Sequence, residues 1–248
     1  MHEGLECGRG ESSPLSMSFV AFKRLLPNRA VPTRILRGPF RGARIVMNPR
    51  DSLRKIFGLY EYELNGWLEH ALRRVTRVLD VGANDGYFTF GCAAAFRRLG
   101  KTGEIIAFEP QARHVAILRE SVAAQMETPA RVEIVQAFVG KALKPGMTTL
   151  DAVRWSVGDP TDKTKTLVKI DVEGAELDVI EGGRSWLHPS NLFVIEVHEE
   201  RFVEPFRALF AEQGLRLVQV NQRTLFLLGR ETRDVKNRWL VSALGALA

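Results

Sequence analysis

The sequence predicts an α/β fold in which a mostly parallel sheet carries helices on both faces and an antiparallel hairpin at its C-terminal edge. Three observations lead to this prediction. Short apolar runs alternate with helical patterns through most of the 248 residues, an order that is typical of a parallel sheet. Acids stand at or just after the ends of several runs, as Asp80, Glu109 and Asp171 do. Gly82 and Gly86 follow the first acid and lead into an alanine-rich helix, which indicates a tight strand-to-helix connection.

The same patterns give the order of the elements. The expected strands are 41–48 (a strand or hairpin arm), 77–81, 104–108, 132–136, 167–171, 192–197, 215–220 and 224–228. The expected helices are 53–72 (one helix or two), 87–99, 111–125, 150–155, 175–180 and 202–213. Gly182 and Gly183 end the fifth of these helices, and residues 221–223 form the turn of the closing hairpin.

The connection after the strand 77–81 has the features of a ligand-binding loop. It reads Asp80-x-Gly82-x-Asn84-x-Gly86, which lacks the third glycine of a dinucleotide fingerprint and the Gly-Lys-Ser/Thr of a P-loop. The next helix begins near Tyr87, so its unpaired N–H groups face whatever occupies the crevice. This pattern is similar to the first motif of class I S-adenosylmethionine-dependent methyltransferases.

A second acid supports a bound nucleoside. Glu109 ends the apolar run that follows one strand–helix unit later, and Pro110 suits the first turn of a helix. A carboxylate at the end of a strand can accept both hydroxyls of a ribose. Glu109 could equally be an ordinary exposed acid, but its place after the glycine loop favours the nucleoside.

Four ordered runs then narrow the family. They are 59–61 (Leu-Tyr-Glu), 149–151 (Thr-Leu-Asp), 167–176 (Leu-Val-Lys-Ile-Asp-Val-Glu-Gly-Ala-Glu) and 193–199 (Phe-Val-Ile-Glu-Val-His-Glu). Together with the glycine loop they resemble the FkbM family of methyltransferases over residues 42–228. The resemblance implies a seven-stranded Rossmann-like sheet, S-adenosyl-L-methionine as methyl donor, and O-methylation of a hydroxyl on a sugar, glycolipid or small natural product. The segments 137–140 and 140–148 depart from the family pattern.

The motif and the resemblance together define the candidate cofactor-binding residues. They are Glu61, Asp80, Gly82, Ala83, Asn84, Asp85, Gly86, Tyr87, Phe88, Thr89, Glu109, Pro110, Gln136, Ala137 and Asp171.

The candidate catalytic residues are His198, Asp171 and Glu173, which stand at the ends of two later strands. His198 is the preferred general base because an imidazole titrates near neutrality, although it could simply be held by a backbone carbonyl. Glu196 points the same way as His198, because side chains alternate along a strand. No metal is expected, since the spacing matches no known metal motif, but Asp171, Glu196 and His198 could converge on one. Glu176 could be a helix cap or a buried polar group.

The positive charge of the chain is concentrated at its N-terminus. Residues 1–50 contain nine basic and three acidic side chains, a difference of +6 that equals the formal net charge of the whole chain. We therefore expect a basic, partly disordered extension over residues 1–40 and the methyltransferase domain over 41–248. A short amphipathic helix at 19–26 could contact anionic lipid or a phosphorylated substrate, unless it packs on the domain.

The composition agrees with a cytoplasmic protein. No apolar run approaches the length of a membrane span, and Cys7 and Cys92 lie too far apart and in too different contexts to suggest a zinc site or disulfide framework. The expected partner is a small-molecule or carbohydrate acceptor. The alternatives are a nucleic-acid methyltransferase, favoured only by the basic N-terminus, a non-catalytic cofactor-binding module, and a nicotinamide-dependent oxidoreductase.

Overall fold

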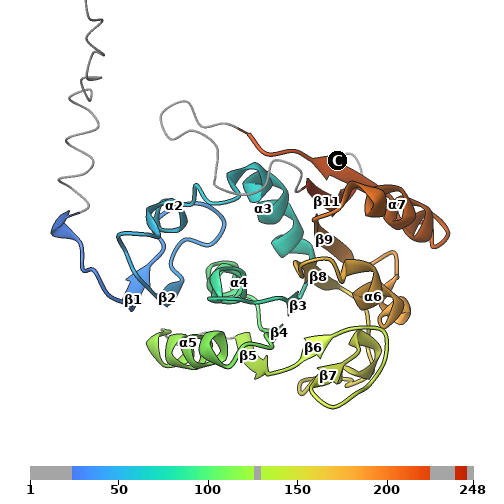
Figure 1. Cartoon of the computed structure of the whole chain (residues 1–248), viewed down its shortest axis with the longest axis horizontal. Helices are drawn as coiled ribbons and strands as arrows, with labels where there is room; N and C mark the ends of the chain where they lie inside the picture. The colour runs from blue at the N-terminus through green and yellow to red at the C-terminus, as the bar shows by residue number, and fades with distance from the viewer. Residues whose placement is uncertain (1–23, 126–129, 224–237, 245–248) are drawn as a thin grey trace, which may run out of the picture.

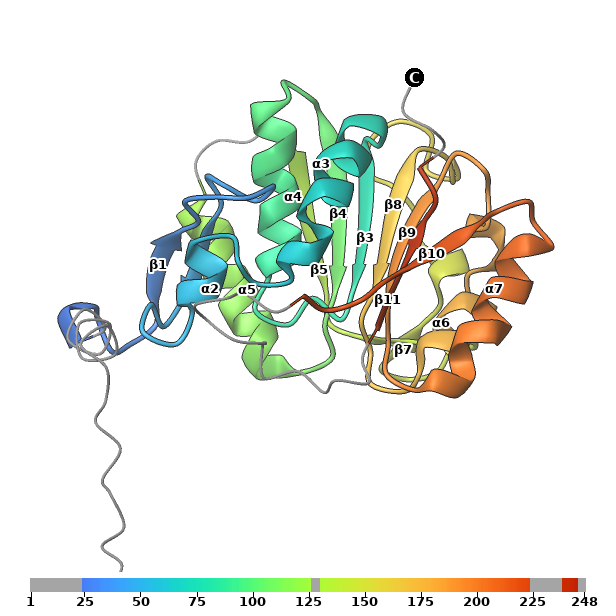
Figure 2. The same ribbon diagram turned by 90° about the horizontal axis from the view of Figure 1, so that it is seen from above.

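The computed structural model describes residues 24–125, 130–223 and 238–244. At its centre is a seven-stranded sheet in the order β10-β11-β9-β8-β3-β4-β5 (Figure 2). The strands of this sheet are β3 (Arg77–Val81), β4 (Gly103–Phe108), β5 (Ala130–Val135), β8 (Thr166–Ile170), β9 (Leu192–Val197), β10 (Leu217–Val220) and β11 (Arg238–Ser242). The predicted α/β class and seven-stranded sheet are confirmed.

All strands of the sheet run in the same direction except β11. Strands β5, β4, β3, β8 and β9 pair in parallel, whereas β11 is antiparallel to both of its neighbours, β9 and β10. The antiparallel edge pair is thus present, and its second strand is β11. The strand expected at 224–228 lies outside the described residues.

Helices cover both faces of the sheet (Figure 1). One face carries α3 (Asn65–Arg74), α4 (Tyr87–Arg98) and α5 (Ala112–Ala124), and the other carries α6 (Glu176–Glu181) and α7 (Val203–Ala211). Successive strand residues point to opposite faces, so Val78 joins the core under α4 while Leu79 joins the core under α6 and α7. Both faces are therefore apolar, which explains the nearly continuous hydrophobic strands.

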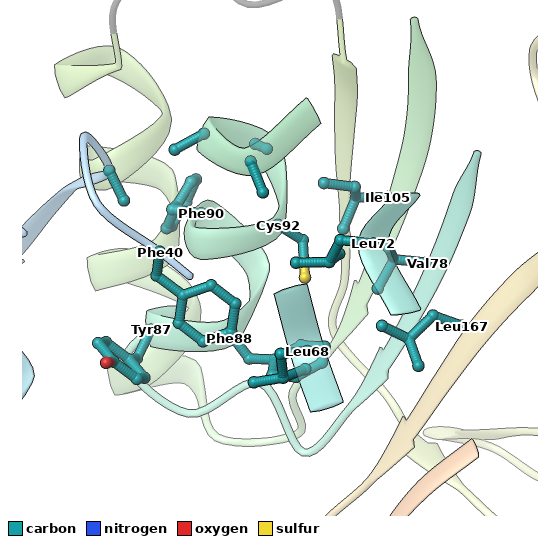
Figure 3. Packing of buried hydrophobic residues seen from close by; sticks show 14 of the residues in the cluster. Phe40, Leu68, Leu72, Val78, Tyr87, Phe88, Phe90, Cys92, Ile105 and Leu167 are labelled. Atoms are coloured by element: carbon teal, nitrogen blue, oxygen red, sulfur yellow. The ribbon is translucent and has the colours of Figure 1, made fainter. Parts of the chain in front are cut away.

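Helix α4 is enclosed on all sides. Ten of its twelve residues are buried, and Figure 3 shows Phe90 and Cys92 on this helix, within the core cluster that also contains Leu72 and Ile105. Phe40 packs edge-on against the first turn, with ring centroids 5.1 Å from Tyr87 and 5.5 Å from Phe88. A helix that is apolar all round is one that the fold must bury.

A hairpin precedes the main sheet. It pairs β1 (Val31–Arg34) with β2 (Arg44–Met47) and contacts α5, where the Val46 N–H donates to the Ser121 hydroxyl at 2.9 Å. The expected boundary at residue 40 falls inside this hairpin. The expected basic helix at 19–26 lies largely outside the described residues.

Some predicted elements have different forms. The helical pattern at 53–72 is divided into α2 (Leu53–Ile56), the 3-10 helix η1 (Tyr62–Leu64) and α3, since Gly58 has a positive φ of 66° that interrupts a helix. The expected helix at 150–155 is only the 3-10 turn η2 (Leu150–Ala152). The remaining elements are the 3-10 turns η3 (Arg184–Trp186) and η4 (Glu200–Phe202) and two short parallel strands, β6 (Phe138–Val139) and β7 (Met147–Thr148). No helix in the described part of the chain is long and apolar enough to cross a membrane.

Candidate functional site

A cavity of about 400 Å³ opens at the carboxyl ends of the parallel strands. This is the edge at which open α/β sheets bind their ligands. The lining residues are Val81, Gly82, Asn84, Phe108, Glu109, Pro110, Gln111, His114, Ala137, Phe138, Val139, Asp171, Val172, Glu173, Ala175 and His198. The structure thus brings together cofactor candidates from the loops after β3, β4 and β5 with all three catalytic candidates.

The glycine loop passes directly under this cavity. Gly82 has a φ of +80°, and the N–H groups of Gly82 and Ala83 both donate to the Phe108 carbonyl at 3.0 Å. A Cβ atom on Gly82 would lie only 1.9 Å from the backbone oxygen of Asp171. Only glycine allows the loop to lie this close to the end of β8.

Glu109 links the end of β4 to the glycine loop. Its side chain is buried and accepts the Asn84 N–H on one oxygen and the Gln111 N–H on the other, both at 2.9 Å. The Nδ1 atom of His114 lies 3.5 Å from the second oxygen. Each carboxylate oxygen accepts more than one hydrogen bond, so Glu109 retains lone pairs toward the cavity that it lines.

Several of the predicted cofactor residues have other positions. Tyr87 and Phe88 are packed into the core rather than lining the cavity, because α4 is buried on every side. The Thr89 hydroxyl donates to Asp80 at 2.5 Å. Three further candidates belong to the glycine loop but do not line the cavity: Ala83 is buried, Asp85 pairs with Lys55 and accepts the Tyr87 N–H, and Gly86 caps α4. Gln136, after β5, donates to the Pro110 carbonyl at 3.5 Å.

Lys169 is a functional candidate that the sequence interpretation missed. Its ammonium group is buried in β8, donates to the Gly82 carbonyl at 2.7 Å, and lies 3.3 Å from Asp80 and 3.2 Å from Asp171. Burial disfavours the charged form, but the charges of Asp171, Asp80 and Glu61 outweigh this effect and raise the pKa of Lys169. The cation therefore holds the glycine loop and Asp171 together. A lysine between apolar residues of a fully buried strand was the available signal.

His198 is oriented by a buried carboxylate. Its Nδ1 atom lies 2.6 Å from Oε1 of Glu176, which is fully buried, and its Nε2 atom lies 3.9 Å from Oδ1 of Asp171. The hydrogen bond with Glu176 raises the pKa of His198 above its usual 6.5; burial opposes this rise, and the charge of Glu196 adds to it. Glu176 is thus a buried polar group, one of the two roles expected for it.

The acidic end of the cavity contains a set of atoms suited to a cation. One ligand atom each from Asp171, Glu196 and His198 lies within 4.8 Å of the other two. Burial raises the pKa of Asp171, but the charge of Lys169 prevails and lowers it, so this carboxylate is ionised. Glu173 is exposed and lines the same end of the cavity.

A family model matches the part of the chain that contributes the acidic end of the cavity. Residues 121–217 match the family model described as the methyltransferase FkbM domain. The resemblance to the FkbM methyltransferases is confirmed. The matched segment of the FkbM domain contains Lys169, Asp171, Glu176, Glu196 and His198, whereas the glycine loop and Glu109 precede it.

One of the solved structures that are similar to this chain shares its fold. The crystal structure of methyltransferase FkbM from Methylobacillus flagellatus KT is 16% identical, has a TM-score of 0.51, and covers 68% of this chain and 44% of its own. The chain therefore spans less than half of that protein. Precorrin-6y C5,15-methyltransferase from Geobacter metallireducens GS-15 is 14% identical, with a TM-score of 0.44 and coverage of 71% and 87%. A putative methylase from Haemophilus influenzae is 13% identical, with a TM-score of 0.44 and coverage of 86% and 98%. No curated protein matches the chain.

Proposed function

We propose that this chain transfers a methyl group from S-adenosyl-L-methionine to a hydroxyl group of a sugar, glycolipid or small natural product. The observation that carries this proposal is the single cavity that joins the glycine loop and Glu109 to Asp171, Glu173 and His198. One end has the groups that suit a nucleoside, and the other has groups that can bind and activate a hydroxyl.

The residues present fit the cofactor. Gly82 and Asn84 line the cavity, so the backbone of the glycine loop is in reach of a bound ligand, and Glu109 is held by two backbone N–H groups in a position to accept ribose hydroxyls. Pro110 and Ala137 line the cavity wall beside Glu109, and we place the adenine ring of the cofactor against this wall. When bound, S-adenosyl-L-methionine supplies a methyl group that its sulfonium has already activated.

The remaining task of the protein is to align and activate the acceptor. Aligning two reacting atoms can lower a barrier by about 7–11 kcal/mol, and proton removal typically contributes about 10²–10⁴-fold. Asp171, Glu173 and His198 line the end of the cavity at which an acceptor hydroxyl would enter. The size of the cavity supports a small acceptor group, and a cytoplasmic location remains part of the proposal.

Calorimetric titration tests the cofactor. Purified protein should bind S-adenosylhomocysteine and S-adenosylmethionine but not NAD. Glu109→Gln should weaken binding by about 10- to 150-fold, the value of a hydrogen bond to a charged group. Glu133→Gln is the matched control, because Glu133 lies on the neighbouring strand β5 and does not line the cavity. A folded sample that binds NAD, or neither adenosyl ligand, would contradict the proposal.

A transfer assay then tests the acceptor class. Radiolabelled methyl groups should be recovered on hydroxyl-bearing sugars or glycolipids as ethers that resist mild alkali. Label found on RNA would favour a nucleic-acid methyltransferase, and alkali-labile label would indicate a carboxyl acceptor.

A further inference from the structure

We propose that Asp171, Glu196 and His198 bind a divalent metal ion at the acceptor end of the cavity. The geometry is close to that of a metal site, since one ligand atom from each residue lies within 4.8 Å of the others. Ligands at about 2.0–2.2 Å from a single ion are at most about 4.4 Å apart, so small side-chain rotations bring all three into coordination. Asp171 and His198 also line the cavity, which gives the ion access to a substrate.

The Nδ1 atom of His198 contacts a carboxylate, which leaves Nε2 as the nitrogen that can bind the metal. A histidine that binds a metal almost always donates its second ring N–H to a carboxylate or carbonyl. Here Nδ1 of His198 lies 2.6 Å from Oε1 of the fully buried Glu176, which is itself anchored by the Gly174 N–H at 3.2 Å. With the proton on Nδ1, the Nε2 lone pair faces Oδ1 of Asp171, 3.9 Å away. Two atoms that can only accept hydrogen bonds thus face each other, which calls for a cation or a proton between them.

Asp171 is prepared in the same way. Lys169 lies 3.2 Å from Oδ2 of Asp171, whereas the oxygen that faces His198 is Oδ1. The lysine thus orients the carboxylate through one oxygen while the other is directed to the proposed metal position.

The local charge also favours a cation. The carboxylates of Asp171, Glu176 and Glu196 surround His198, and Glu176 and Glu196 are buried. The Oε2 atom of Glu176 has no hydrogen-bond partner among the described residues. Buried acids are typically paired or coordinate a metal, so a divalent ion is a suitable further partner for this group of carboxylates.

The ligand set indicates the class of ion. Imidazole suits first-row transition metals and carboxylates suit Mn²⁺, so we expect a first-row divalent ion with positions open to the acceptor. This role deepens the proposed function and, for its catalytic meaning, rests on it. A hydroxyl bound to the ion would lose its proton more readily, and Glu173, exposed at the same end, is placed to accept it. His198 is then a metal ligand, and its contribution to activating the hydroxyl passes through the ion.

Metal binding is tested without cofactor or acceptor. Full-length protein is stripped with chelator, and Mn²⁺ is titrated in while the electron paramagnetic resonance signal of free Mn²⁺ is recorded. We expect one tightly bound ion per chain and at least tenfold weaker binding for Glu196→Gln and His198→Gln. Glu176→Gln should weaken binding by about 10- to 100-fold, as for other residues that orient a ligand. Glu199→Gln is the matched control, because it removes one charge from a half-buried acid that is next to His198 in sequence and pairs with Arg201, and it should leave the affinity within threefold.

The outcomes separate this inference from the proposed function. Wild-type protein that binds no stoichiometric Mn²⁺, or binding that the three site variants leave unchanged, overturns the metal site. Circular dichroism of each variant identifies those that fail to fold, and the wild-type titration decides the question if all of them do. If the protein binds S-adenosylhomocysteine and transfers methyl groups at full rate in chelator, the inference falls and the proposed function stands. If Mn²⁺ binds at Asp171, Glu196 and His198 but the adenosyl ligands do not, the reverse holds.

Discussion

Replacing Gly82 by alanine should damage both the stability of the protein and its affinity for the cofactor. Gly82 has a φ of +80°, and an added Cβ would lie 1.9 Å from the backbone oxygen of Asp171. Real Cβ atoms essentially never come closer than 3.0 Å to such an atom, so the loop or the end of β8 must move by about 1 Å. The left-handed backbone costs about 1–2 kcal/mol for a residue other than glycine, and overpacking costs about 1–3 kcal/mol. We therefore expect a loss of about 2–5 kcal/mol.

Gly100 offers a matched control. It also has a positive φ, of 63°, but an added Cβ there would meet nothing within 4 Å. Gly100→Ala should thus lose only the backbone contribution of about 1–2 kcal/mol and should bind S-adenosylhomocysteine as the wild type does. Urea unfolding gives the stability of both variants, and calorimetry gives their affinities. If Gly82→Ala equals Gly100→Ala in both measurements, the close approach of the loop to Asp171 has been misjudged.

Two further predictions concern the buried charges. Lys169→Met removes the partner of Asp80 and Asp171 and should cost about 3–5 kcal/mol, as breaking a buried ion pair does; urea unfolding measures this, and a loss below 1 kcal/mol would show that the pairs contribute little. In metal-free protein the pKa of His198 is raised by Glu176, so the stabilisation from the protonated ring is fully present below pH 6.5 and is lost as the pH rises through the higher folded-state pKa. Thermal unfolding from pH 5 to 9 should show this loss for the wild type and not for His198→Gln, and parallel profiles for the two proteins would contradict it.

The order of the elements was accessible from sequence because it depends on local patterns. The strands 77–81 and 192–197 were predicted with the bounds that the structure has, since each is a short apolar run next to a charged or polar residue. The sequence left open whether 53–72 forms one helix or two. The point of division was not predicted, because it depends on Gly58, whose added Cβ would lie 2.5 Å from the carbonyl oxygen of Arg37, a residue 21 positions earlier in the sequence. Such a contact has no signature in the local sequence.

In the candidate site, too, some residues could be predicted from the sequence and others could not. Gly82, Asn84 and Glu109 could be proposed from their spacing, because a glycine loop and a strand-end acid are local features that recur at this edge of such sheets. Tyr87 and Phe88 follow the same loop but pack into the core against Phe40, since the hairpin that carries Phe40 covers the start of α4.

The sequence alone therefore determined the fold class, the order of most strands and the edge of the sheet at which ligands bind, because hydrophobic periodicity and turn chemistry encode these locally. Only the tertiary structure decided which polar groups meet. Strand pairing sets Lys169 opposite Asp80, and the fold brings Glu176 of α6 to the ring of His198 beyond β9. These contacts join residues 89 and 22 positions apart in sequence, and their energies depend on burial and distance, which exist only once the sheet has formed.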